Sequence, residues 1–233
     1  MKDILGKAIL DYFNDNFSED IFTETSISEE DTLPILYLFR SFDEMPPLEQ
    51  TALKHAYGKV LDIGCGAGSH SLYLQKKNAD VTAIDISEGA IKTSKLRGVK
   101  KAFQQDVFQL KDQKFDTILL LMNGTGIFGK YKEVPKKLLH LKSLLNQEGQ
   151  ILIDSSDIIY MFDEDEDGGK WIPMDGDYYG ELTYTLKYKG ERETTTWLYL
   201  DFTTLQTFCQ MAGLKCELLA EGEHYNYLAK ITL

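Results

Sequence analysis

Residues 60–70 read Val-Leu-Asp-Ile-Gly-Cys-Gly-Ala-Gly-Ser-His, and their three alternating glycines have the spacing of a loop that holds a nucleotide-containing cofactor. An apolar run precedes Gly64, Gly66 and Gly68 and a helical pattern follows them, so the segment predicts a strand, a tight turn and a helix. Glycine has no side chain, so this backbone can turn sharply and approach a ligand closely. Ser69 stands where the dinucleotide pattern G-x-G-x-x-G has its last glycine, which favours a cofactor other than NAD.

Polar residues follow the next predicted strands at the points where those strands end. Asp85 follows the apolar run 81–84 and lies about 20 residues after Gly64, the interval typical of a ribose-binding acid. Asp106 ends a third run, and Asn123 follows a fourth. Because ligands bind outside the carboxyl ends of parallel strands, these side chains predict one continuous cleft.

At these residues the sequence resembles the class I S-adenosylmethionine-dependent methyltransferases. Val60–Gly68 resembles their first motif, Ala83–Ser87 the second and Gln105–Val107 the third. The resemblance implies S-adenosyl-L-methionine as cofactor, with its ribose on Asp85 and its adenine at Asp106. The cofactor-binding residues expected on this basis are Asp62, Gly64, Cys65, Gly66, Gly68, Asp85, Ile86, Asp106, Val107 and Asn123.

Residues 121–124, Leu-Met-Asn-Gly, lie where this family has its fourth motif, beside the sulfonium and the acceptor. They depart from the Asn/Asp-Pro-Pro-Tyr/Phe motif of the enzymes that methylate amino groups of nucleobases or glutamine. The departure counts against those acceptors.

No residue pair has the spacing of a catalytic acid and base, so the catalytic residues stay open. Asn123, His70 and His224 are weak candidates, because Asn-Gly is also a common turn dipeptide and the two histidines also suit a helix start and a hairpin turn. Tyr37 and Arg40 precede the glycine loop. A guanidinium suits the carboxylate of the cofactor, although an arginine on the surface is an equal alternative.

Charge and composition limit the partners. Lys and Arg number 25 and Asp and Glu 37, so the net charge is −12, whereas enzymes of nucleic acids usually present a basic face. The lysines within residues 130–142 alternate with leucines and predict the solvated face of a helix. No apolar run approaches the ~20 residues of a membrane span, and no signal-peptide pattern opens the sequence. Three cysteines without metal-ligand spacing indicate reduced thiols, so we expect a cytoplasmic protein without a metal site.

Strand and helix patterns alternate through the middle of the chain and predict an α/β fold with a doubly wound, mostly parallel, seven-stranded sheet. We expect a helical cap over residues 1–57, with a helix starting at residues 28–31, and a methyltransferase domain over residues 58–233. Residues 155–199 are expected to form an insertion with an acidic loop at 163–167 and an added β-hairpin from residue 182.

These features predict an enzyme that transfers a methyl group from S-adenosylmethionine to a small-molecule acceptor by in-line displacement. Two alternatives remain at this point, a non-catalytic protein that binds S-adenosylmethionine and an NAD-binding Rossmann oxidoreductase. We expect no nucleic-acid or membrane partner, and either a monomer or a homodimer.

Overall fold

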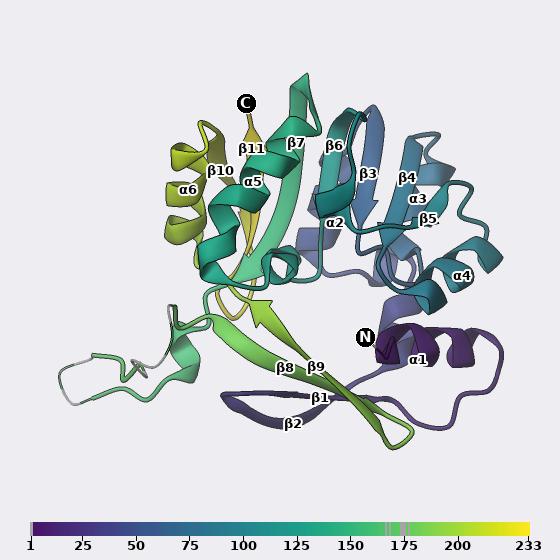
Figure 1. Ribbon diagram of the computed structural model, residues 1–233, viewed down its shortest axis with the longest axis horizontal. Helices are drawn as coiled ribbons and strands as arrows, with labels where there is room; N and C mark the ends of the chain where they lie inside the picture. Colours follow the sequence, from purple (N-terminus) through teal and green to yellow (C-terminus); the bar gives the residue numbers. More distant parts are fainter. Residues whose placement is uncertain (1, 166, 168, 173–175, 177) are drawn as a thin grey trace.

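The computed structural model describes residues 2–165, 167, 169–172, 176 and 178–233. Two sheets organise this part of the chain, a large one of seven strands and a small one of four (Figure 1). None of the helices in these ranges is long and apolar enough to cross a membrane.

The large sheet has the strand order β10-β11-β7-β6-β3-β4-β5. The pairs among β3 to β7 are parallel, whereas β11 is inserted antiparallel between β7 and β10. This arrangement confirms the predicted doubly wound sheet. The strands are β3 (Lys59–Ile63), β4 (Asp80–Asp85), β5 (Ala102–Gln104), β6 (Phe115–Leu120), β7 (Leu145–Ser156), β10 (Lys215–Glu221) and β11 (Asn226–Thr232).

Helices cover both faces of the large sheet. On one face, α2 (Pro47–His55) and α3 (Ser69–Lys76) pack on side chains of β3, β4, β6 and β7, and α4 (Glu88–Leu96) packs beside them on β4 and β5. On the opposite face lie α5 (Val134–Ser143) and α6 (Phe202–Met211). Burial on both faces explains why the strands are apolar runs without alternation.

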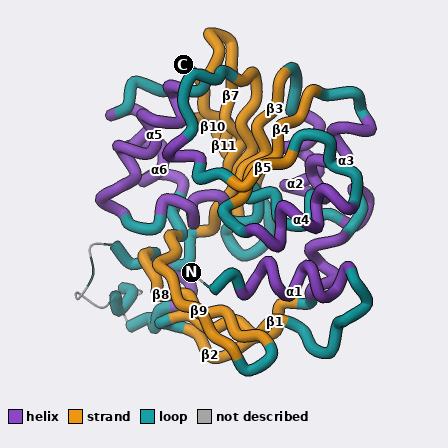
Figure 2. The backbone as a smooth tube through the Cα atoms, turned by 45° about the vertical axis from the view of Figure 1, so that its right-hand side comes forward, coloured by secondary structure: helices purple, strands orange, loops and turns teal. Residues whose placement is uncertain are grey.

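The small sheet joins the N-terminal region to the hairpin, in the order β2-β1-β8-β9 (Figure 2). Its strands are β1 (Ile21–Thr25), β2 (Ser28–Leu33), β8 (Glu181–Tyr188) and β9 (Glu191–Leu198). The predicted hairpin is thus confirmed, whereas the helix predicted from residues 28–31 is wrong. That acidic run resembles a first helical turn, but its backbone pairs with β1, with Phe22 opposite Thr32.

Helix α1 (Ile4–Phe13) contacts both α4, which covers the large sheet, and the small sheet. The Asp3 carboxylate accepts hydrogen bonds from Gly6 N–H, which caps α1, and from Gly89 N–H on α4. A Cβ added to Gly89 would lie 2.4 Å from the carbonyl carbon of Gly6, so the two helices meet through glycines. Ile4 of α1 is packed against Tyr188 of the small sheet.

The remaining helical segments in the described ranges are short 3-10 turns, namely Ile35–Phe39, Phe42–Glu44, Val107–Gln109, Gly124–Phe128, Tyr131–Glu133 and Ile159–Met161. The acidic loop predicted at 163–167 includes Glu166, which lies outside the described residues. The described residues beside it form a turn in which Glu164 pairs with Lys170.

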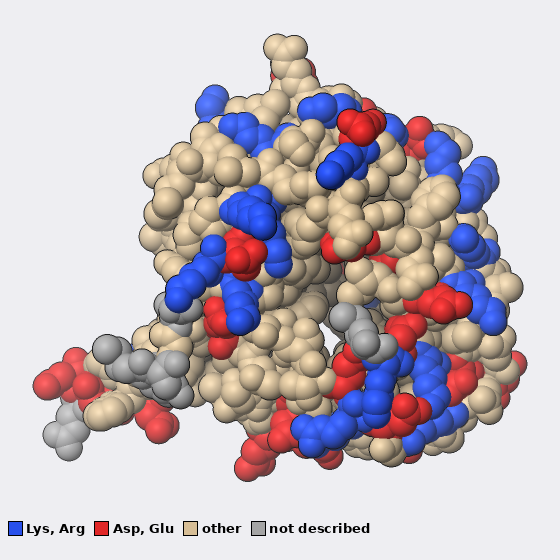
Figure 3. Space-filling view, viewed as in Figure 1, with Lys and Arg blue, Asp and Glu red and all other residues tan. Residues whose placement is uncertain are grey.

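The face shown in Figure 3 is hollowed between the large sheet and the small sheet. Acidic and basic side chains are intermingled over this face rather than gathered in a basic stripe. The hollow lies at the carboxyl ends of the parallel strands, where the sequence predicts the cleft.

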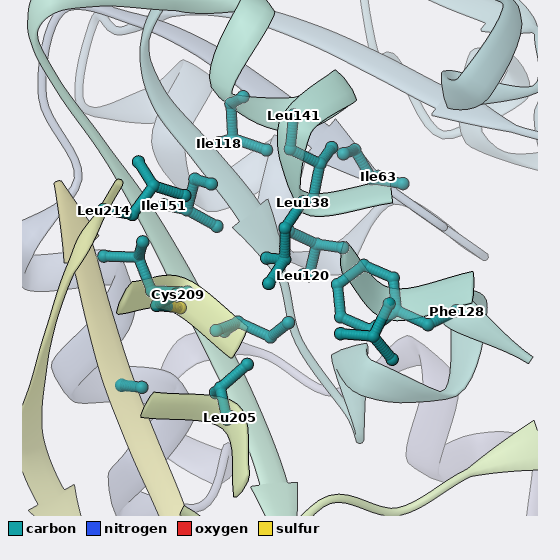
Figure 4. Packing of buried hydrophobic residues seen from close by; sticks show 14 of the residues in the cluster. Ile63, Ile118, Leu120, Phe128, Leu138, Leu141, Ile151, Leu205, Cys209 and Leu214 are labelled. Carbon is teal, nitrogen blue, oxygen red and sulfur yellow. The ribbon is translucent and has the colours of Figure 1, made fainter. Parts of the chain in front are cut away.

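The largest apolar cluster lies under α5 and α6 (Figure 4). Leu138 and Leu141 of α5 are fully buried against Ile118 and Ile151 of the sheet, and Leu205 of α6 packs beside them. Truncating any of these leucines to alanine costs about 2–5 kcal/mol of folding free energy. This core fixes the strand ends, and therefore the loops that form the site.

Candidate functional site

The glycine loop after β3 has a left-handed backbone, with φ of 69° at Gly64 and 53° at Gly66. The N–H groups of Gly64 and Cys65 donate to the Ile84 carbonyl at 2.9 and 3.1 Å, which fixes the loop against β4. A Cβ added to Gly64 or Gly66 would meet no heavy atom of the described residues within 4 Å. The space above the two glycines is therefore open in the described structure.

Gly68 and Cys65 serve a different purpose from the first two glycines. A Cβ on Gly68 would lie 2.8 Å from Cγ2 of Val99, so this glycine lets the start of α3 pack closely. The Cys65 side chain is buried among Ile91 and Ala102, and burial raises the pKa of its thiol well above the usual value. The sequence assigned both residues to the cofactor, but their side-chain positions face the core.

Asp85 lies at the end of β4, as predicted, and holds the glycine loop in place. Its carboxylate accepts hydrogen bonds from Gly66 N–H at 3.0 Å and from Ser87 N–H at 2.9 Å. Burial raises the pKa of Asp85 above its usual value even though the two hydrogen bonds favour the ionised form.

A cavity of about 400 Å³ opens beside Asp85, and we call it the glycine-loop cavity. The structure brings Gly64, Asp85, Ile86, Asp106 and Val107 together along its wall, as the sequence predicts. Trp197 of β9 lines the opposite side, where its ring lies against Gly126, since a Cβ on Gly126 would be 2.0 Å from Trp197 Cε2.

A second cavity of about 430 Å³ lies at the carboxyl end of β7, under the small sheet, and we call it the β7 cavity. Strands β1, β2 and β8 contribute to its lining, so the predicted cap and insertion both reach it. The residues around it that later sections use are Glu29, Asp31, Asn123, Asp154, Tyr160, Tyr184, Tyr199 and His224.

Asp154 lies in β7 and lines the β7 cavity, as Asp85 in β4 lines the glycine-loop cavity. Its carboxylate accepts from Met122 N–H at 3.1 Å and from Gly124 N–H at 2.9 Å. Burial raises the pKa of Asp154 to about 6, with a smaller contribution from the negative charge of Glu49.

Asn123 lines the β7 cavity and not the glycine-loop cavity. Its backbone is left-handed, with φ of 59°, and its side-chain oxygen accepts hydrogen bonds from Ser155 at 2.9 Å and Thr125 at 3.3 Å. Gly126, three residues later, lines the glycine-loop cavity, so the turn that begins at Asn123 lies between the two cavities.

Arg40, Glu49 and His70 form a buried network behind the glycine loop. Glu49 accepts from Arg40 through one oxygen, and its other oxygen lies 2.6 Å from His70 Nε2. Burial alone would raise the pKa of Glu49, but the His70 hydrogen bond and the nearby cations outweigh it and hold that pKa below its usual value. Burial lowers the pKa of His70, but Glu49 and the charge of Asp62 outweigh it and raise that pKa.

The network shows where Arg40 and His70 lie. Arg40 is 7% exposed, so it is not a surface residue, and its guanidinium stacks 3.7 Å above the Tyr37 ring centroid. Its charge is already compensated by Glu49, and its Nε has no hydrogen-bond partner among the described residues. His70 is buried, its Nε2 faces Glu49, and it lines neither cavity.

Two further predicted residues lie apart from the glycine-loop cavity. Asp62 is buried and accepts a 2.5 Å hydrogen bond from the Ser71 hydroxyl, so it holds α3 against β3. His224 is exposed, has a left-handed φ of 53° and lines the β7 cavity.

Sequence reasoning missed Glu49 and Asp154 as residues of the site. Asp154 had a usable signal, because it is an acid at the carboxyl end of a predicted strand, like Asp85. Glu49 had none, because its position depends on how α2 packs on the domain.

Known proteins match this arrangement. A family model described as a methyltransferase domain matches residues 54–198, more than half of the chain. The chain belongs to this methyltransferase family. Its sheet order and glycine loop are those of the class I S-adenosylmethionine-dependent methyltransferases, which confirms the predicted family and fold class.

Solved structures support the same assignment for the methyltransferase. The crystal structure of an S-adenosylmethionine-dependent methyltransferase from Bacteroides fragilis, in complex with S-adenosyl-L-homocysteine, matches with a TM-score of 0.91 and 43% identity. The match covers 100% of the present chain and 95% of that one. The CcbJ methyltransferase from Streptomyces caelestis matches in fold, with a TM-score of 0.62 at 14% identity over 82% of this chain and 94% of that one.

Among curated relatives, the methyltransferase is 35% identical over 108 residues to the ribosomal RNA small subunit methyltransferase C of Haemophilus influenzae (strain PittEE). That alignment covers 41% of this chain and 32% of the relative, so the chain spans less than half of that protein's length.

Proposed function

We propose that this enzyme transfers the methyl group of S-adenosylmethionine to a small molecule bound in the β7 cavity. The observation that carries the proposal is the pair of cavities on either side of the turn that begins at Asn123, one with a cofactor loop and one without. Such an arrangement suits a cofactor and an acceptor that meet at one point.

The residues of the glycine-loop cavity fit this cofactor. A Cβ would fill the space above Gly64 and Gly66, so both positions leave room for a ligand close to the backbone. Asp85 and Asp106 offer carboxylate oxygens to hydroxyl and amino groups, and Ile86 and Val107 offer apolar surface to a purine ring. When bound, the cofactor supplies an electrophilic methyl group on a sulfonium.

The protein then has to orient the acceptor and exclude water. Asp85 holds the cofactor loop through Gly66 N–H, and Asp154 holds the acceptor side through Met122 N–H and Gly124 N–H. Loops fixed in this way place the two reactants without further ordering, and correct placement supplies several kcal/mol of the activation free energy. Strands β1, β2 and β8 of the small sheet form part of the wall of the β7 cavity.

A small acceptor agrees better with the charges than a ribosomal RNA. Glu29 and Asp31 at the edge of the β7 cavity would repel phosphates, and the protein carries a net charge of −12. Two lysines of the predicted basic helix are also engaged, since Lys137 donates to the Phe128 carbonyl and Lys142 to the Ala212 carbonyl.

Calorimetric titration tests the proposal. S-adenosylmethionine and S-adenosyl-L-homocysteine are expected to bind, and NAD is not. Binding of NAD alone would return the chain to the oxidoreductase alternative, and no binding of the sulfur ligands would overturn the proposal. A single-stranded oligoribonucleotide added to the loaded protein is expected to give no heat, and salt-dependent binding of that RNA would contradict a small-molecule acceptor.

A further inference from the structure

The β7 cavity carries an excess of negative charge. Asp154 is partly buried in its wall, and the exposed side chains of Glu29 and Asp31 lie at its edge. None of its lining residues that the structure describes is a lysine or an arginine. A ligand with a positive charge would therefore find carboxylate partners there, and an anion would find no lysine or arginine among the described lining residues.

The lysine that pairs with acids of the small sheet lies on the face away from this cavity. Glu29 and Asp31 of β2 line the cavity, whereas Glu30 between them does not and pairs with Lys187 at 2.9 Å. Lys187 also pairs with Glu24 of β1, at 2.6 Å. Lys187 thus neutralises Glu24 and Glu30 on the outer face of the small sheet, whereas Glu29 and Asp31 form no ion pair among the described residues.

Aromatic rings add a second feature that favours a cation. Tyr160, Tyr184 and Tyr199 line the same cavity. Burial raises the pKa of Tyr199 to about 12 and also raises the pKa of Tyr184, so both hydroxyl groups stay neutral at physiological pH. The faces of neutral tyrosine rings attract organic cations.

We propose that the methyl acceptor is a small organic amine, held in the β7 cavity as an ammonium ion against the carboxylate of Asp154. The inference rests on the proposed function, because it names the class of molecule that this site methylates. A basic amine differs from the amino groups of nucleobases and glutamine, which carry no charge and which the missing Pro-Pro-aromatic motif already disfavours.

The chemistry of an amine fits this set of residues. The ammonium ion first gives one proton to the Asp154 carboxylate, its nitrogen lone pair then forms the new N–C bond, and the electron pair of the broken C–S bond stays on sulfur. The product is a methylated ammonium ion, and Asp154 returns its proton to solvent. An alcohol would need a much stronger base than this carboxylate.

Matched ligand pairs test the class of acceptor. The probes are tyramine and tyrosol, glucosamine and glucose, and putrescine and 1,4-butanediol, titrated into the full-length protein saturated with S-adenosyl-L-homocysteine. At least one amine is expected to bind about tenfold or more tightly than its alcohol, because a charge-assisted hydrogen bond replaces a neutral one. An alcohol that binds as tightly as its amine, or a panel in which no amine binds, would overturn the inference.

Substitutions of the acidic residues test whether these residues bind the amine. Asp154→Asn is expected to abolish amine binding, and the double variant Glu29→Gln/Asp31→Asn to weaken it several-fold while leaving the fold intact, since both rim residues are exposed. Glu30→Gln, on the same strand but the other face, is the matched control and is expected to change nothing.

S-adenosyl-L-homocysteine affinity is measured for every variant. If the parent protein does not bind S-adenosyl-L-homocysteine, the proposed function is wrong. If it binds this ligand but binds amines and alcohols equally well, only the inference of an amine acceptor is wrong. Unchanged amine binding in both acid variants would also overturn the inference.

Discussion

The Asp154 carboxylate accepts a hydrogen bond from Gly124 N–H at 2.9 Å, in the loop that follows the neighbouring strand β6. Asp85 does the same for Gly66 N–H at 3.0 Å, in the loop that follows its neighbour β3. In both cases an acid at the end of one parallel strand fixes the loop after the adjacent strand. The two cavities are therefore built by the same relationship, repeated on the two halves of the sheet.

Replacing Asp85 tests the cofactor side of this relationship. Asp85→Ala is expected to weaken binding of S-adenosyl-L-homocysteine by about tenfold or more, because it removes the bond to Gly66 N–H together with the carboxylate that we assign to the ribose. Calorimetric titration measures the change. Asp80→Ala, an exposed acid at the other end of the same strand, is the control. Equal affinity of the Asp85 variant and the control would refute the ribose assignment.

A pair of glycine variants separates backbone strain from loss of ligand space. Gly66 and Gly190 have similar left-handed φ values, 53° and 73°, and an added Cβ at either meets no described heavy atom within 4 Å. Alanine therefore costs about 1–2 kcal/mol of folding free energy at both positions. Only Gly66→Ala is expected to lose cofactor affinity, because Gly190 lies in the turn of the small-sheet hairpin.

Denaturant unfolding and titration measure the two effects for each glycine variant. Equal losses of stability with cofactor affinity lost only at Gly66 are the expected outcome. If Gly66→Ala binds S-adenosyl-L-homocysteine as tightly as the parent, the ligand does not approach that loop.

The elements that could be predicted from the sequence are those that depend on residues close together in the chain. Strands β3 and β4, the loop between β3 and α3, and the acids Asp85 and Asp106 follow from apolar runs and from residues next to one another in sequence. The small sheet does not, because β1 pairs with β8 across most of the chain, with Thr25 opposite Tyr184. The pairing partner of an acidic strand such as β2 cannot be read from the strand itself.

The site shows the same division at the level of single residues. A motif places Gly68 and Cys65 in the loop, but only the packing of α4 shows that the Cys65 side chain is buried in the core and that a Cβ at Gly68 would clash there. Glu49 is an ordinary acid in the sequence of α2, and only tertiary packing puts it between Arg40 and His70.

The buried network gives the folding stability a predictable pH dependence. The pKa of His70 is raised in the folded state, so its contribution is complete below about pH 6.5 and is lost as the pH rises through the folded-state pKa. The pKa of Glu49 is lowered, so its contribution is present above the ordinary carboxylate pKa and is lost as the pH falls through the folded-state value.

His70→Gln is expected to reduce the free energy of unfolding by about 1–3 kcal/mol at pH near 6 and by less in alkaline solution. Urea unfolding at a series of pH values measures this slope. His55→Gln, at an exposed position on α2, is the matched control and is expected to keep the parent's pH dependence. An unchanged slope in the His70 variant would show that His70 is neutral in the folded protein.

We expect acceptor binding in the β7 cavity to depend on pH, because burial raises the pKa of Asp154 to about 6. Burial is the main cause of the raised pKa, and the negative charge of Glu49 adds to it, whereas the N–H donors of Gly124 and Met122 and the charge of His70 lower it. Asp154 is mostly ionised at about pH 7 and mostly protonated at about pH 5, while an aliphatic amine remains a cation at both.

The affinity for the best-binding amine is therefore expected to fall about tenfold from neutral to mildly acidic solution, because protonation removes the ion pair. Titration at the two pH values measures this fall. The matched alcohol supplies the control, since its weaker binding involves no ion pair and is expected to stay level. An amine affinity that does not change over this range would show that the carboxylate of Asp154 does not hold the ammonium group.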